Sequence, residues 1–150
     1  MNKIRRAFTL AAAAASVVVL TSTPASAYPN WQPWGADGFY YCGPTTHSGP
    51  STKVIHQTCI RENYAGQAQA VLLVRNNATV DITLNEGSVW WYTGKEGSIL
   101  SRDDCTQTVV RPGQLKACYG GTYSAQQGQM AISGYLYNND YNVTEPVYKR

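Results

Sequence analysis

The 150-residue chain has few charged residues and only two histidines, His47 and His56. Charged side chains make up 14% of the sequence, and neither G-x-S-x-G nor H-E-x-x-H occurs in it. Asp103–Asp104 is the only pair of adjacent acids. Because neighbouring residues on a strand point to opposite faces, we expect a loop or a strand cap there and not an acid–base couple. The sequence predicts no catalytic residues, no metal ligands and no cofactor, and His56 is interpreted as a packed or strand-surface histidine.

The first 27 residues have the three parts of a secretory signal. Lys3, Arg5 and Arg6 precede an apolar run over residues 7–20, which is followed by small residues up to Ala27. The apolar run is too short for a membrane span. We expect secretion to the extracellular space, by the general secretory route or, since two arginines are adjacent, by the twin-arginine route. Cleavage is expected after Ala27.

The predicted mature chain lacks an excess of either charge. Three of the twelve basic residues fall within the signal, so nine basic residues balance nine acidic ones. Binding to nucleic acid through a broad basic face needs clustered positive charge, and attachment to a membrane surface needs a polybasic segment. Neither feature is present in the sequence. We therefore expect no nucleic-acid partner, and no membrane attachment after signal cleavage.

Four cysteines lie in the predicted mature chain, and an even number in an exported protein predicts two disulfides. Of the three possible pairings we favour Cys42–Cys59 and Cys105–Cys118, because each closes a short segment that contains turn residues. Pro112–Gly113 suits the centre of a type II turn. A hairpin loop over residues 110–113 would then place Cys105 opposite Cys118. Metal or redox chemistry is the alternative, but no C-x-x-C motif occurs.

Short apolar runs separated by glycine, asparagine and proline predict an all-β protein. Residues 68–76 (AQAVLLVRN) have an apolar centre typical of a buried strand, and apolar and polar side chains alternate over residues 78–85. The alternation predicts an inward face made of Val80, Ile82 and Leu84. Asn76–Asn77 between the two segments favours a hairpin. We expect one small antiparallel β-sandwich or barrel over residues 39–150, stapled by the two disulfides.

Aromatic residues are the strongest functional signal in the sequence. Strand geometry places Trp90 and Tyr92 on one face, opposite to their immediate neighbours in the chain. Tyr135 and Tyr137 share a face in the same way. Each pair is either packed in a half-buried sheet or part of an aromatic platform for a sugar ring or a partner protein.

Residues 28–38 predict an N-terminal arm rich in aromatic residues and proline. Its prolines remove backbone donors, so we do not expect a central strand before residue 39. Trp31 and Trp34 are candidate binding residues, because a stiff extended segment loses little entropy when it docks. The arm either covers the face of Trp90 on its own domain or enters a groove of another protein.

An export signal, four cysteines, the size of the first disulfide ring and the β content together resemble small exported actinobacterial proteins with disulfide-stapled β-sandwiches. Some of those proteins are inhibitors of enzymes, such as the tendamistat-type inhibitors of amylases. The Trp-Arg-Tyr inhibitory turn of that family has no match in this sequence. No site residues are therefore carried over.

Three functions remain open from the sequence. The first is a secreted, non-catalytic protein-binding module, either an adaptor in an extracellular assembly or an inhibitor of a secreted enzyme. The alternatives are a carbohydrate- or cell-wall-binding module and a small hydrolase with an unrecognised site. The candidate binding residues are Trp31, Trp34, Trp90, Tyr92, Tyr135 and Tyr137. Coplanar exposed rings would favour a sugar ligand, a projecting arm a protein partner, and two close carboxyl groups an enzyme.

Overall fold

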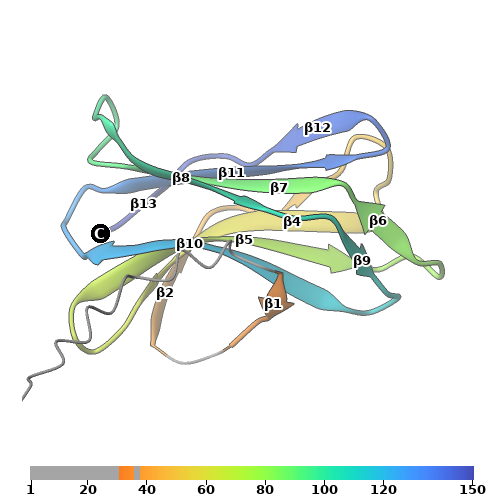
Figure 1. Ribbon diagram of the computed structural model, residues 1–150, viewed down its shortest axis with the longest axis horizontal. Coiled ribbons are helices and arrows are strands. Elements are labelled where there is room, and N and C mark those ends of the chain that lie inside the picture. Colours follow the sequence, from red (N-terminus) through yellow and green to blue (C-terminus); the bar gives the residue numbers. More distant parts are fainter. Residues whose placement is uncertain (1–30, 36–37) are drawn as a thin grey trace, which may run out of the picture.

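The computed structural model describes residues 31–35 and 38–150, so the predicted signal and its cleavage site lie outside the described residues. Two antiparallel sheets face each other as two layers in Figure 1. The larger sheet has the strand order β1 (Gln32–Pro33), β10 (Leu115–Ser124), β5 (Gln67–Asn76), β4 (Val54–Glu62) and β2 (Phe39–Cys42), and β3 (Thr46–His47) also pairs with β4.

The second sheet has the order β12 (Asp140–Val143), β11 (Met130–Tyr137), β7 (Glu86–Tyr92) and β8 (Ile99–Cys105), and β13 (Val147–Tyr148) pairs with β11. A separate ladder joins β6 (Ile82–Leu84) to β9 (Thr108–Val110). These antiparallel sheets confirm the predicted all-β fold, which is sandwich-like. Among the described residues, no helix is long and apolar enough to cross a membrane.

Alternating residues of both sheets fill the space between the layers. On β4 and β5 the inward positions include Val54, Ile60 and Leu72, and on the second sheet they include Val89 and Trp91, all of them buried. Alternation along each strand produces this arrangement, because successive side chains point to opposite faces of a sheet. The core cluster comprises Val54, Ile60, Ala68, Ala70, Leu72, Val74, Ile82, Leu84, Val89, Trp91, Cys105, Val110, Cys118, Ala131, Tyr135, Tyr137 and Val147.

The predicted hairpin at Asn76–Asn77 is wrong, and so is one of the three residues assigned to its inward face. Ile82 and Leu84 are buried, but Val80 is 63% exposed. The cause is Asn76, whose buried side-chain amide donates to the carbonyl oxygens of Val80 and Val110, at 2.8 and 2.9 Å. These bonds end β5 and turn the chain away from it. The strand that follows begins only at Ile82 and pairs with β9, not with β5.

Both predicted disulfides are present, but Cys105–Cys118 forms for a reason other than the predicted hairpin. The turn at Pro112–Gly113 exists, since the Gln114 amide donates to the Arg111 carbonyl and Gly113 has φ +73°. However, β9 pairs with β6, so the two cysteines do not face each other across one ladder. Cys105 belongs to β8 and Cys118 to β10, and their Cα atoms are 6.0 Å apart across the two layers. This disulfide therefore joins the two sheets.

Candidate binding groove

The outer face of the larger sheet carries a second apolar cluster, separate from the core. Its buried members are Cys59, Val71, Leu73, Ala117 and Tyr119, against which Trp34 and Leu115 pack. Outward positions of a sandwich are normally polar and solvated. The apolar outer face is covered in part by Trp34 and Leu115 among the described residues.

Trp31 docks the N-terminal arm at the edge of the sandwich. The arm forms β1, which pairs with β10 at the edge of the larger sheet. The Trp31 Nε1 donates to the Thr106 carbonyl at 2.7 Å. Its ring lies over Gly87, where a Cβ atom, if one were added, would be only 2.5 Å from Trp31 Cζ2. The absence of a side chain at Gly87 thus provides the space for the indole, which packs against the core cluster.

Trp34 lies on the other side of the same edge, over the outer apolar cluster. Its ring is stacked on Tyr119 with a centroid distance of 6.3 Å, and it contacts Tyr40 at 4.7 Å. The Tyr40 hydroxyl donates to the Gly35 carbonyl at 2.7 Å, and the Gly35 amide donates to the Tyr119 hydroxyl at 3.3 Å. The described part of the arm is therefore fixed on its own domain, by contacts with β10, β2, Gly87 and Thr106 and not with the outer face of Trp90.

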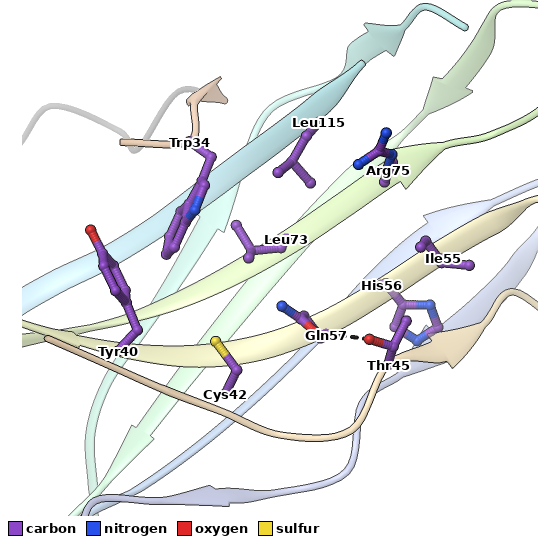
Figure 2. A pocket seen from close by; sticks show the side chains of 10 residues that line it. All are labelled: Trp34, Tyr40, Cys42, Thr45, Ile55, His56, Gln57, Leu73, Arg75 and Leu115. Atoms are coloured by element: carbon purple, nitrogen blue, oxygen red, sulfur yellow. Dashed lines mark hydrogen bonds between the residues drawn. The ribbon is translucent and has the colours of Figure 1, made fainter. Parts of the chain in front are cut away.

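An open groove of about 370 Å³ remains beside Trp34. Figure 2 shows Trp34 and Tyr40 together at one end, Leu73 in the middle, and Arg75 and Ile55 towards the other end. The walls come from strands β2, β4, β5 and β10 and from the segments that follow β1 and β2, so the groove crosses the larger sheet. The lining residues are Trp34, Tyr40, Cys42, Thr45, Ile55, His56, Gln57, Leu73, Arg75 and Leu115.

The groove has an apolar floor and a small number of polar groups at its rim. The Thr45 hydroxyl donates to Gln57 Oε1 at 2.9 Å, which fixes the Gln57 amide. Arg75 is exposed, and its Nε donates to Asn77 Oδ1 at 3.0 Å. The lining residues that the structure describes carry one full positive charge and no carboxylate. The rim therefore complements an anionic group next to an apolar one.

His56 is one of the lining residues, but its side chain faces the core beneath the floor of the groove. The histidine is buried, and its Nδ1 lies 3.2 Å from the hydroxyl of Tyr135. Burial lowers the pKa of His56, and it raises the pKa of Tyr135 to about 12, since both charged forms lose hydration. The two side chains thus form a neutral pair inside the sandwich near neutral pH, in agreement with the interpretation of His56 as a packed histidine.

The structure separates the six candidate binding residues into four places. Trp34 lines the groove, and Trp31 packs at the end of the core. Trp90 and Tyr92 are half-buried on the outer face of the second sheet. Tyr135 and Tyr137 do share a face opposite Leu136, but that face is the core, where both are buried. Tyr135 and Tyr137 are therefore not accessible to a binding partner in this structure.

Sequence reasoning missed most of the groove, including Leu73, Leu115 and Ile55. These residues look like ordinary members of apolar strands. The sequence does carry one signal: residues 70–74, "AVLLV", are apolar at consecutive positions, which is typical of a strand buried on both faces. This pattern indicates a covered outer face on β5, although it does not indicate what covers it.

The acidic pair lies within β8 and not in the loop or strand cap that the sequence predicted. Asp103 Oδ2 accepts a hydrogen bond from the Gly121 amide at 2.8 Å, and Asp104 Oδ1 accepts one from the Ser88 hydroxyl at 2.6 Å. The two carboxylates point to opposite faces of the strand, so each is engaged separately. Over residues 31–35 and 38–150, no group of three or more potential metal-ligating side chains is arranged around a common point.

The fold and the groove define a class of protein: a disulfide-bonded protein with an antiparallel, sandwich-like β fold and an apolar groove on its surface. Two disulfides are typical of proteins that reside in an oxidising, extracellular environment. Neither a protein-family model nor a curated protein matches the chain.

Proposed function

We propose that this chain is a secreted, non-catalytic protein-binding module whose groove receives an apolar side chain of an extended segment in an extracellular partner. The partner is a component of an extracellular assembly or a secreted enzyme that the module inhibits. The observation that carries this proposal is the apolar groove of about 370 Å³, open on an outer sheet face and walled by Trp34 and Tyr40. Aromatic side chains in such positions are the usual anchors of protein interfaces.

Preorganisation supports the assignment of the groove as a binding site. Trp34 is held by its contacts with Tyr40 and Tyr119, and Tyr40 is held in turn by its bond to Gly35. Side chains that are already ordered lose little entropy when a ligand binds. The arm therefore acts by building one wall of the site, and its tryptophan is presented to the partner from a fixed position.

The charge at the rim of the groove indicates which residues the partner segment contains. Arg75 is the only charged side chain among the described residues that line the groove. Because a partner carboxylate beside the inserted apolar group would face this guanidinium, such a segment would be favoured over a basic one. We expect the partner to present an aliphatic or aromatic anchor that is followed closely by aspartate or glutamate.

The test is affinity capture from the culture fluid of the producing organism, with the mature protein and four single variants as bait. Leu115→Glu and Arg75→Glu alter the groove. Val109→Glu and Lys53→Glu introduce the same charges at exposed positions of β9 and of the loop before β4, outside the groove. We expect one protein to be captured by the mature chain and by both control variants.

The two groove variants should capture that protein at least tenfold less, which corresponds to about 1.4 kcal/mol. Thermal melting of all four variants checks that each is folded. Capture that is equal for all four folded variants would show that the groove is not the binding site. Failure of the mature protein to retain any protein would argue against the protein-binding function itself.

A further inference from the structure

A second set of aromatic rings lies on the outer face of the second sheet. Trp90 and Tyr92 project outward from β7, opposite to the buried Val89 and Trp91. Tyr92 pairs with Met130, and Met130 pairs with Tyr148, so the side chains of these three residues lie on the same outer face of the sheet. Directly opposed residues of antiparallel strands have side chains on the same face.

Tyr141 extends the same face to β12. It pairs with Leu136, which pairs with Glu86 of β7, so its ring is also directed outward. Tyr141 and Tyr148 are exposed, whereas Trp90 and Tyr92 are half-buried. Successive outward positions on one strand are about 7 Å apart. We call the surface formed by Trp90, Tyr92, Tyr141 and Tyr148 the aromatic face.

The indole of Trp90 is held in a fixed orientation. The Arg102 guanidinium lies 5.7 Å from the centre of the Trp90 ring, and Tyr141 meets the ring edge-on at a centroid distance of 6.4 Å. Arg102 is directly opposite Trp90 on the neighbouring strand β8. This arrangement leaves a rigid, partly exposed ring in the middle of a sheet surface.

Polar groups of both signs surround that ring. Arg102 Nε donates to Asp104 Oδ1 at 3.3 Å, and the Ser88 hydroxyl lies 2.6 Å from the same carboxylate oxygen and 3.4 Å from Glu86 Oε1. Tyr141 also hydrogen-bonds with Ser88, and the partial burial of its hydroxyl raises the pKa of that group, which remains a donor at neutral pH. The side chains of Arg102 and Asp104 are about half exposed, so both retain free hydrogen-bonding capacity towards solvent.

We propose that the aromatic face is a binding site for a neutral polysaccharide chain. The planes of Trp90 and Tyr141 are inclined at 67°, so the two rings do not form one coplanar platform, and a sugar would stack on a single ring through its flat C–H surface. Its hydroxyls would act as both donors and acceptors. Arg102 supplies donors, while Asp104 and Glu86 supply acceptors, at the edge of Trp90. Because two carboxylates and one cationic group lie there, the surface favours an uncharged polyhydroxylated polymer over a polyanion.

This site is independent of the groove, since the two lie on opposite outer faces of the sandwich. A polysaccharide on the aromatic face would leave the groove accessible. The chain would then connect a polysaccharide surface to a protein, which is how it would act as an adaptor. The polysaccharide site does not depend on that role, and each site has its own test.

The experiment measures sedimentation of the mature protein with microcrystalline cellulose and with chitin, as two insoluble neutral polysaccharides. Trp90→Ala and Asp104→Asn change the aromatic face. Tyr64→Ala removes a ring that is 86% exposed but lies in the loop between β4 and β5, and Leu115→Glu changes only the groove. Trp90→Phe retains a smaller ring and serves as a second variant should the alanine variant melt early.

We expect the mature protein, Tyr64→Ala and Leu115→Glu to bind at least one polysaccharide with the same affinity. Trp90→Ala should bind at least tenfold more weakly, with Trp90→Phe and Asp104→Asn between the two. Absence of binding to both polysaccharides would overturn the proposal, as would equal binding by the mature protein and Trp90→Ala. Loss of protein capture by Trp90→Ala without any polysaccharide binding would identify the face as a protein interface instead.

Discussion

Replacement of Gly87 by alanine tests how the N-terminal arm is fixed. The strand backbone at Gly87 is paired on both sides, with Cys105 of β8 and Tyr135 of β11, so it has little freedom to move. An added Cβ would be 2.5 Å from Cζ2 and 3.1 Å from Cη2 of Trp31. The ring must therefore move away, and its hydrogen bond to Thr106 is lost.

The cost follows from the contacts of Trp31. A large aromatic side chain buries about 150 Å² or more, which corresponds to ~4 kcal/mol at about 25 cal/mol per Å². The hydrogen bond adds ~1 kcal/mol. Release of the ordered Trp31 returns about 2 kcal/mol of conformational entropy. We expect Gly87→Ala to lower the free energy of unfolding by ~3 kcal/mol when the ring is fully displaced.

The same substitution should have the opposite sign in a protein that lacks the indole. Gly87 does not have a positive φ, and alanine is favoured over glycine inside a strand by roughly 0.5–1 kcal/mol. In a Trp31→Ala background, Gly87→Ala should therefore stabilise the protein by that amount. Urea unfolding of the parent, both single variants and the double variant gives the coupling energy. Equal effects of Gly87→Ala in the two backgrounds would refute the placement of Trp31 over Gly87.

Three further predictions concern the core. Ile82→Ala should cost ~2–5 kcal/mol, whereas Val80→Ala should change stability by no more than about 0.5 kcal/mol, as measured by urea unfolding; similar costs would show that the two residues have the same environment. Because burial lowers the pKa of His56, the unfolded chain binds more protons below pH 6.5, so stability should fall by up to ~1.4 kcal/mol per pH unit on acidification from that point. His56→Gln should remove this slope, and an unchanged slope would assign it to other groups. Non-reducing peptide mapping should recover Cys105 linked to Cys118, and a fragment with Cys59 linked to Cys105 would contradict the pairing.

Local patterns were sufficient to predict the fold class, because alternation and turn residues act within a few positions of the chain. The predicted buried strand at residues 68–76 lies within β5, and Val89 and Trp91 are buried as their alternation with Trp90 requires. The partners of the strands were not predictable in the same way. β6 pairs with β9 across some twenty intervening residues, and such pairing depends on the whole packed structure. The error at Val80 arose from one side chain, since Asn76 caps its own strand instead of starting a hairpin.

The candidate site was predictable only in part. Trp34 could be selected from its aromatic, proline-rich context, but the residues that face it could not. Leu73 and Leu115 reach the groove because β5 and β10 are neighbours in the larger sheet, a long-range pairing without a local signal. The position of Trp31 depends on its contact with Gly87. The sequence does not indicate which aromatic ring packs over a given glycine. For Tyr135 and Tyr137 the sequence left open whether their shared face is core or solvent, and in the structure it is the core.

The disulfide between β8 and β10 has a mechanical consequence if both proposed binding sites are occupied at the same time. A polymer held on the second sheet and a partner held on the larger sheet would pull the two layers apart or past each other. Side-chain packing alone resists such a load with many weak contacts that can yield in sequence. Cys105–Cys118 places a covalent bond in the load path between the layers. Under reducing conditions the same sandwich should therefore yield at a lower force, with separation of its sheets as the first event.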